Sequence, residues 1–367
     1  MDSRAPTGDS DAIHTRLRAI GWSAWFEERF AEHGRGGSEP GRVIADHGSA
    51  YLVQLEAAAV QAVVAGRLRH AASTRASLPT VGDWVALQRL GHGDQGSIVA
   101  VLERRSAVSR KEADASTVEQ VMAANVDRVF VVAALSEEVN LRRLERYLTI
   151  AWNSGASPVI VLTKADLAAD PAQALAGVEP IALGAPVLLA SGATGVGLDR
   201  LRAELGAGLT GVLIGPSGVG KSTLINRLMG DALLKTQAVR RDGKGRHTTT
   251  HRQLTILHHG GMLIDTPGLR ELQLWGDGSA LEQAFEDVAR LATGCRFRDC
   301  RHQGEPSCAV RRAVEQGELQ ADRLASYRKL ERELHALAIR SSVRLQQEER
   351  RKWRLIQKSA RDRTRPG

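Results

Sequence analysis

Gly215-Pro-Ser-Gly-Val-Gly-Lys-Ser222 is the stretch that decides the fold of this 367-residue chain. It matches the pattern G-x-x-x-x-G-K-[ST], and it lies between an apolar run at residues 211–214 and a helix-forming run at residues 222–229. A strand before the loop and a helix after it are the context in which this pattern binds phosphate. Its glycines let consecutive backbone N–H groups turn toward phosphate oxygens without a side chain in the way. We therefore interpret the stretch as a phosphate-binding loop rather than a glycine-rich turn with an incidental lysine.

The expected roles of the loop side chains follow from the charge of a nucleotide. Lys221 neutralises the β- and γ-phosphates, and the Ser222 hydroxyl ligates Mg²⁺. The residues predicted to surround the phosphates are Gly215, Pro216, Ser217, Gly218, Val219, Gly220, Lys221, Ser222 and Thr223.

A second motif, Asp265-Thr-Pro-Gly268, follows the apolar run at residues 262–264. An aspartate at a strand end near the phosphate loop can hold a water of Mg²⁺, and the Gly268 N–H can approach the γ-phosphate. The tetrapeptide is weak alone, but beside a phosphate-binding loop it favours a GTPase over a kinase.

A base-reading motif, Thr163-Lys164-Ala165-Asp166, ends the apolar run at residues 158–162. In guanine-binding GTPases the aspartate of [N/T]-K-x-D accepts hydrogen bonds from the guanine N1 and 2-amino groups, which adenine does not offer. Leaving such a carboxylate unpaired costs several kcal/mol, so the motif specifies guanine. Ser191-Gly192-Ala193, at another predicted strand end, resembles the loop whose backbone reads the guanine O6.

The order of these motifs is the most informative feature of the sequence. An ordinary GTPase runs from the phosphate loop to the base-reading motif, whereas here Thr163 and Ser191 precede Gly215. The predicted domain is therefore circularly permuted, which costs little because strand adjacency and not chain order builds the site. Apolar strands and amphipathic helices alternate over residues 112–275, which predicts an α/β domain with a doubly wound parallel sheet.

Upstream, residues 41–105 hold five short alternating runs that predict a closed β-barrel of the oligonucleotide-binding (OB) type. The segment Gly91–Gly96 spells G-x-G-x-x-G. The run after it reads as a strand where a dinucleotide site needs a helix, so we interpret it as a loop. Residues 1–40 are expected to be an extension, and residues 106–116 a polar linker.

All three cysteines lie within fourteen residues, in the pattern Cys295-x4-Cys300-x-His302-x5-Cys308. Three thiolates and an imidazole make a closed ligand set for tetrahedral Zn²⁺, with no position open for water, which predicts a structural metal. An odd number of cysteines argues against a disulfide framework. The zinc-binding, helical module is expected to span residues 284–367. Arginines around the ligands can meet phosphates or simply form a solvated surface: Arg296, Arg298, Arg301, Arg311 and Arg312.

Charge and hydropathy narrow the class of protein further. Residues 320–367 contain fourteen Lys and Arg against six Asp and Glu, so they account for the whole net charge of +8. A basic terminal segment is typical of a nucleic-acid partner, and we interpret this one as an RNA-contacting helix or arm, with a solvated extension as the alternative. No apolar run approaches the roughly 20 residues of a membrane span, and no secretory signal is seen, so we expect a cytoplasmic protein without a membrane partner.

Together these motifs resemble one family, the circularly permuted GTPases of small ribosomal subunit biogenesis, the RsgA type. The resemblance extends over residues 41–332. Besides the phosphate loop its markers are A-A-N-V-D-R-V at 123–129, G-K-G-R-H-T-T-T at 243–250, D-T-P-G at 265–268 and F-R-D-C-R-H-Q-G-E-P-S-C-A-V at 297–310. It implies a monomeric GTPase of late 30S maturation that contacts rRNA, whose hydrolysis is stimulated by the small subunit, with Mg²⁺ and one Zn²⁺ as cofactors.

The resemblance also implies roles at the reaction itself. His247 would position the attacking water, and Thr249 would be the switch residue that ligates Mg²⁺; the alternative for His247 is a solvated loop histidine. Lys221, Asp265 and Gly268 complete the set of residues expected at the reacting phosphate.

Two other functions remain open on the sequence. An RNA-binding module that uses GTP only as a binding switch would bind nucleotide without stimulated hydrolysis. A P-loop small-molecule kinase would transfer phosphate to an acceptor other than water, and it would need neither Asp166 to read guanine nor a Cys₃His cluster.

Overall fold

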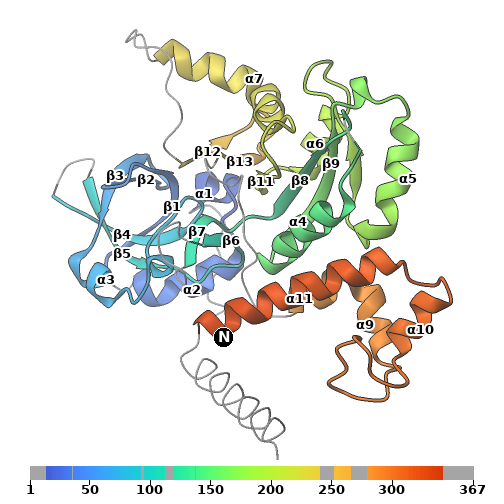
Figure 1. Cartoon of the computed structure of the whole chain (residues 1–367). Coiled ribbons are helices and arrows are strands. Elements are labelled where there is room, and N and C mark those ends of the chain that lie inside the picture. Colours follow the sequence, from blue (N-terminus) through green and yellow to red (C-terminus); the bar gives the residue numbers. More distant parts are fainter. Residues whose placement is uncertain are drawn as a thin grey trace, which may run out of the picture. The chain divides into compact units, whose positions relative to one another are not determined.

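The structure is a computed structural model of the chain (Figure 1), and it describes residues 14–34, 36–91, 95–111, 119–136, 138–239, 252–265 and 279–341. Contacts within the chain divide it into two compact units, Met1–Arg110 with Gln120–Leu272, and Lys111–Glu119 with Gln273–Gly367. The first unit holds a barrel and an α/β sheet, and the second holds the cysteine cluster. Among the described helices, none is both long and apolar enough to cross a membrane.

Five strands of the first unit close into the predicted barrel, in the order β1-β2-β3-β5-β4 with β4 paired back to β1. All of these pairings are antiparallel except that of β3 with β5. Inward-facing side chains such as Val53, Val85 and Ile98 are fully buried and fill the barrel. The bounds are β1 Glu39–Asp46, β2 Tyr51–Gln54, β3 Ala59–Val64, β4 Trp84–Arg89 and β5 Gln95–Val101, with α3 Gly66–Ala71 and η1 Arg75–Ser77 between β3 and β4. Residues 92–94 of the G-x-G-x-x-G segment lie outside the described residues, and its last glycine, Gly96, lies in β5, so the expected strand is present where a dinucleotide site needs a helix.

Residues 14–34, expected to be part of an extension, form two helices that pack on the barrel: α1 Thr15–Ala19 and α2 Ala24–Gly34. Trp22, between the helices, meets Trp84 of β4 edge-on with ring centroids 4.8 Å apart. The ring of Phe26 lies 5.5 Å from the same indole. Because Trp22, Phe26 and Trp84 are all buried, this segment belongs to the core of the first unit.

The α/β part of the first unit is a parallel sheet that continues directly into the barrel. Five strands run parallel in the order β10-β9-β8-β11-β13. β12 is antiparallel to β13 and pairs on its other side with β1 of the barrel. The bounds are β8 Arg128–Ala134, β9 Ser157–Thr163, β10 Val187–Leu189, β11 Thr210–Ile214, β12 Arg252–Ile256 and β13 Met262–Asp265.

Helices cover both faces of this parallel sheet, as a doubly wound fold requires (Figure 1). Phe130 and Val132 of β8 pack with Leu201 of α6 and Leu224 of α7, whereas α4 contacts β8 and β9 from the other face. The bounds are α4 Leu141–Asn153, η2 Ala165–Leu167, α5 Pro171–Ala182, α6 Leu198–Glu204 and α7 Lys221–Val239. The helix predicted after the phosphate loop is therefore present, and it continues past its predicted end.

The segment expected to be a polar linker contains a strand instead. β6, Ala107–Lys111, pairs with β7, Glu119–Ala124, in a separate two-stranded sheet. Val108 is 1% exposed. Val108 is followed by polar residues, so the segment lacks the alternation of apolar and polar side chains that distinguishes a strand from a linker in sequence.

Within its described residues, the second unit has four helices besides the cysteine cluster: α8 Ser279–Ala284, α9 Glu286–Ala292, α10 Ala309–Glu315 and α11 Ala321–Ser341. Arg323 of α11 is 7% exposed and forms a bidentate ion pair with Asp287 of α9, at 2.8 and 2.9 Å. Its guanidinium also lies 4.3 Å from the centroid of the Phe285 ring. This buried pair fixes α11 to α8 and α9. Of the basic segment at residues 320–367, the first part forms α11, as the expected helix, and residues 342–367 lie outside the described residues.

Candidate nucleotide site and metal centre

The base-reading motif and the phosphate loop lie side by side, although the chain reaches them in reverse order. The Thr163 hydroxyl at the end of β9 donates a hydrogen bond to the Val219 carbonyl of the phosphate loop, and it lies 3.2 Å from the Ala133 carbonyl of β8. Thr163 is 1% exposed, so this contact is shielded from water. The order of the strands explains this contact. β9 and β11, the strand that leads into the phosphate loop, flank β8 on its two sides, so their ends lie close together at one edge of the sheet.

The predicted O6-reading loop, Ser191–Ala193, rests on the helix that follows the phosphate loop. Arg227 of α7 donates hydrogen bonds to the carbonyls of Gly192 and Ala193, at 2.9 and 2.8 Å. A Cβ at Gly192 would lie 2.7 Å from Thr223 Cγ2, so the missing side chain is what allows this approach. The Gly192 carbonyl and the Ala193 N–H belong to the same peptide group, and in a trans peptide these two bonds point in opposite directions. Because the carbonyl faces Arg227, the Ala193 N–H points away from it.

The phosphate loop has the backbone geometry that its glycines permit. Gly215 has φ +144°, and a Cβ there would lie 2.4 Å from the Val132 carbonyl of β8. Lys221 begins α7, and its ammonium donates hydrogen bonds to the carbonyls of Gly215, at 2.7 Å, and Pro216. Ser222 is exposed in the first turn of α7. The N-terminus of a helix this long favours an anion through its unpaired N–H groups and its dipole.

Asp166 lies in η2 with its carboxylate exposed to solvent. Two contacts hold the two residues that precede it. The Ala165 N–H donates to the Ala190 carbonyl at 3.2 Å, and Lys164, in the left-handed region with φ 55°, donates to the Ser136 hydroxyl at 3.3 Å. A cavity of about 390 Å³ lies between Lys164, residues 216–219 of the phosphate loop, and Asn140 before α4.

Asp265 is the last residue of β13, which runs parallel to β11 and next to it. The carboxyl ends of parallel strands meet at the same edge of a sheet, so Asp265 ends at the edge that also holds the phosphate loop. The remaining residues predicted at the reacting phosphate, His247, Thr249 and Gly268, lie outside the described residues.

Arg227 is the residue that sequence reasoning missed at this site. It belongs to no motif, because its contacts are to backbone carbonyls of a loop more than thirty positions earlier in the chain. The only available signal was its place one and a half helical turns after Lys221, on the helix that the motif predicted.

The four predicted zinc ligands converge in the second unit. Their ligand atoms all lie within 4.8 Å of one another. Cys295 Sγ and Cys308 Sγ lie 3.9 Å apart, and His302 Nδ1 is 3.6 Å from the first and 3.4 Å from the second. Tetrahedral Zn²⁺ with Zn–S of about 2.3 Å and Zn–N of about 2.0 Å requires S···S of about 3.8 Å and S···N of about 3.5 Å. The cluster therefore fits one zinc ion, with His302 binding through Nδ1.

The chemistry of the thiols also favours a cation. Burial opposes ionisation of Cys295, but the backbone N–H groups of Val310 and Ala309 outweigh it and lower the pKa of this thiol. Burial, reinforced by the neighbouring thiols, raises the pKa of Cys300 to about 12. A thiolate at Cys295 therefore opposes ionisation of the neighbouring Cys300, and a bound cation would relieve that repulsion.

The loop between the ligands is held by Glu305. Its carboxylate accepts hydrogen bonds from the N–H groups of Arg301 at 2.9 Å, Gln303 at 2.7 Å and Gly304 at 3.0 Å. The N–H groups of Glu305 itself, Gly304, Arg301 and Gln303 lower the pKa of the Glu305 carboxyl to about 2. All five arginines noted around the ligands are exposed: Arg296, Arg298, Arg301, Arg311 and Arg312.

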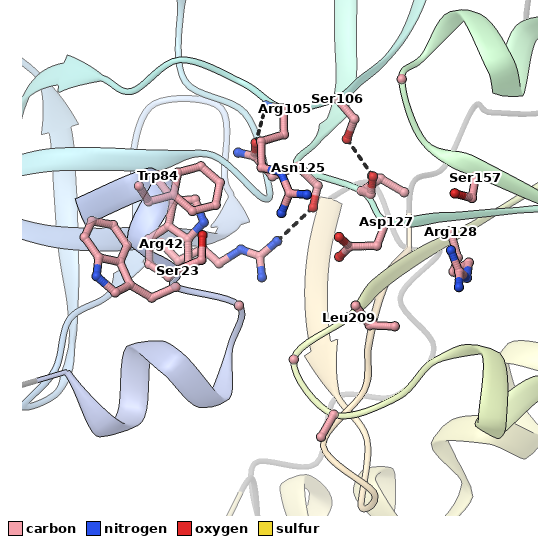
Figure 2. Close-up of a pocket in the computed structure, with 17 residues that line it drawn as sticks. Ser23, Arg42, Trp84, Arg105, Ser106, Asn125, Asp127, Arg128, Ser157 and Leu209 are labelled. Atoms are coloured by element: carbon pink, nitrogen blue, oxygen red, sulfur yellow. Dashed lines mark hydrogen bonds between the residues drawn. The ribbon is translucent and has the colours of Figure 1, made fainter. Parts of the chain in front are cut away.

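A second cavity of the first unit, of about 460 Å³, lies where the barrel meets the end of the sheet at which β11 begins. Figure 2 shows Arg42 of β1 extending from the side of Trp84 toward Asn125. The Arg42 guanidinium donates to the Thr210 hydroxyl of β11 at 2.8 Å and to the Asn125 carbonyl at 3.2 Å. Its Nη1 also lies 3.5 Å from the sulfur of Met262, the first residue of β13.

This arginine is fully buried, and burial lowers the pKa of Arg42 to about 10, against the attraction of the carboxylates of Asp127 and Asp83. Its hydrogen-bond partners include the Thr210 hydroxyl at the start of β11 and the carbonyl of Asn125, between β7 and β8. Arg42 is therefore a bridge between barrel and sheet and lies away from the phosphate loop.

Comparison with known proteins gives three consistent results. The family model of the RsgA GTPase matches residues 101–275. The chain is 46% identical over 359 residues to the small ribosomal subunit biogenesis GTPase RsgA of Opitutus terrae, covering 95% of this chain and 98% of the relative. Two solved structures share the fold. YjeQ from Thermotoga maritima has a TM-score of 0.62 at 28% identity, over 81% of this chain and 98% of that one. YloQ, described as a circularly permuted GTPase, has a TM-score of 0.58 at 24% identity, over 83% and 96%.

Proposed function

Because the chain belongs to the RsgA GTPase family and is therefore a circularly permuted GTPase, we propose that it hydrolyses GTP on the small ribosomal subunit during the subunit's biogenesis. The Opitutus terrae relative is named as a small ribosomal subunit biogenesis GTPase. The stimulation of hydrolysis by the subunit, and a place late in 30S maturation, are part of the proposal. The expected monomeric state and cytoplasmic location stay predictions.

The observation that supports guanine binding most strongly is the contact between Thr163 and Val219. It joins the end of β9, where Asp166 follows, to the loop that would hold the phosphates. In this proposal Asp166 accepts hydrogen bonds from guanine N1 and the 2-amino group, and the Ala193 N–H, turned away from Arg227, donates to guanine O6. The phosphates then occupy the N-terminus of α7.

The reacting phosphate would be held by residues from three segments. Lys221 would exchange its loop carbonyl partners for β- and γ-phosphate oxygens, and Gly268 would donate its N–H to the γ-phosphate. Ser222 and Thr249 would ligate Mg²⁺ directly, and Asp265 would hold one of its waters. When bound, Mg²⁺ neutralises charge on the β- and γ-phosphates. His247 would orient the attacking water, because no glutamine follows Gly268 closely enough to do so.

The zinc ion, in this proposal, is structural. Cys295, Cys300, His302 and Cys308 complete a tetrahedron, so no ligand position is left for water or substrate. Its contribution is to fold the loop that displays exposed arginines, and rRNA phosphates are the partner that such arginines fit.

Turnover of GTP and of ATP, each with and without purified small subunits, tests the proposal. We expect hydrolysis of GTP but not of ATP, and a rate that rises when small subunits are added, with large subunits as the control. GTP binding without any rise in rate would favour an RNA-binding module that uses GTP as a switch. Phosphate transfer to an acceptor other than water would favour a small-molecule kinase.

A further inference from the structure

The barrel and the phosphate site are joined by one row of residues across three adjacent strands. Ala45 of β1 stands opposite Gln253 of β12, and Gln253 stands opposite Asp265 of β13. Neighbouring strands lie about 4.8 Å apart, so this row spans only about 10 Å from the barrel to the carboxylate at the phosphate site. Figure 1 shows β12 and β13 between β1 of the barrel and β11.

The connection between β1 and β12 is short and needs support from side chains. Within the residues that the structure describes, two residue pairs make it, Ala45 with Gln253 and Asp46 with Arg252. β1 reaches it through an irregularity between Val43 and Ala45, where its register with β2 shifts. A bulge of this kind redirects a strand. Beyond it, Ala45 and Asp46 keep their pairing with β2 on one side and pair with β12 on the other, so this end of β1 belongs to both the barrel and the sheet.

Arg252, the first residue of β12, supplies that support. Its guanidinium lies 4.0 Å from the Asp46 carboxylate. It also donates hydrogen bonds to the Thr80 hydroxyl at 3.4 Å and to the Val121 carbonyl of β7 at 3.3 Å. The Arg252 and Asp46 side chains are only 17% and 20% exposed, so water screens the pair weakly. One side chain thus ties β12 to the barrel wall, to the loop before β4 and to β7.

Resting on the proposed function, we propose that Arg252 is a positioning residue that couples the barrel to GTP hydrolysis. It holds β12 in register with β1, and β12 holds β13, whose last residue is Asp265. Arg42 holds β1 to the opposite ends of the sheet strands, because it contacts Thr210 and Met262, the first residues of β11 and β13. A partner that binds the barrel and shifts β1 therefore moves the Asp265 carboxylate relative to the phosphate loop.

The test compares Arg252→Met and Asp46→Asn with Arg202→Met. Arg202 loses a comparable ion pair, to Asp199 at 2.7 Å, but on the exposed surface of α6. The first measurement is the ratio of the turnover numbers with and without small subunits. The second is the ratio of small-subunit affinities measured with a non-hydrolysable GTP analogue and with GDP. A residue with only a structural role would lower stability without changing either ratio, and thermal unfolding reports that stability separately.

We expect Arg252→Met to reduce both ratios by about fivefold or more, the usual lower range of coupling between sites, while the GTP affinity stays within about twofold. Asp46→Asn should act in the same direction with a smaller effect, and the double variant should lose less than the product of the two single losses, because both remove the same contact. Arg202→Met should behave as the wild type. Unchanged ratios in a folded Arg252→Met or Asp46→Asn protein would overturn the inference. A wild type whose turnover does not respond to subunits at all would instead overturn the proposed function.

Discussion

Replacing Thr163 by valine removes one hydroxyl and leaves the shape of the side chain nearly unchanged. The hydroxyl is the direct link between the base-reading strand and the phosphate loop, through the Val219 carbonyl. At 1% exposure no water can take its place without a local opening of the structure. Withdrawing the donor from a buried carbonyl costs about 1–3 kcal/mol.

The loss should appear in nucleotide binding, since the loop must keep its position relative to Asp166 for one nucleotide to meet both. A cost of about 1–2 kcal/mol in the bound state raises the Kd for GTP by about five- to thirtyfold. Fluorescence titration with GTP and GDP measures it, and thermal unfolding reports the fold in parallel. Thr163→Ser keeps the hydroxyl and should stay within about threefold of the wild type. A folded Thr163→Val protein with a GTP affinity within twofold of the wild type would refute the reasoning.

Three further predictions concern the O6-reading loop, the metal and pH. Gly192→Ala places a methyl 2.7 Å from Thr223 Cγ2 and should weaken GTP binding by about 1–3 kcal/mol; Gly177→Ala in α5, where nothing lies within 4 Å, is the matched control and should leave the Kd unchanged. Elemental analysis should find one zinc ion per chain, and chelation or Cys300→Ser should unfold the second unit, measured as lost helical circular dichroism; a metal-free protein with full helicity contradicts this. The carboxyl of Glu305 should titrate near pH 2 by NMR. Because that pKa is lowered on folding, its stabilising effect is present above pH 4.5 and is lost as the pH falls toward 2; a midpoint near 4.5 would contradict the N–H contacts.

The parts of this molecule that sequence alone predicts are those in which chemistry fixes residue type and spacing. The phosphate loop needs a glycine at position 215, because a Cβ there would lie 2.4 Å from the carbonyl oxygen of Val132. A closed structural zinc site of this kind uses cysteine and histidine, so Cys295, Cys300, His302 and Cys308 could be predicted directly. The barrel and the parallel sheet followed from hydrophobic periodicity, which burial imposes on every strand.

The remaining features depend on contacts between segments far apart in the chain, which periodicity does not encode. The pairing of β1 with β12 joins residues about two hundred positions apart, and in the described part of the chain it consists of two residue pairs. No motif or spacing in the sequence marks Arg42, yet it is buried among backbone and hydroxyl groups of other elements. Trp22 was visible as an aromatic residue, but its partner Trp84 lies in another predicted segment, so the first helices were expected to be an extension.

Asp166→Asn tests most directly the central claim that the base-reading motif and the phosphate loop bind one guanine nucleotide. Guanine offers two donors, N1–H and the 2-amino group, to a carboxylate, whereas xanthine has a carbonyl in place of the 2-amino group. An asparagine amide presents one acceptor and one donor and so matches xanthine instead. We predict that Asp166→Asn loses GTP affinity by about a hundredfold or more and gains affinity for xanthosine triphosphate. A variant that binds GTP as tightly as the wild type, with no gain for the xanthine nucleotide, would contradict the account.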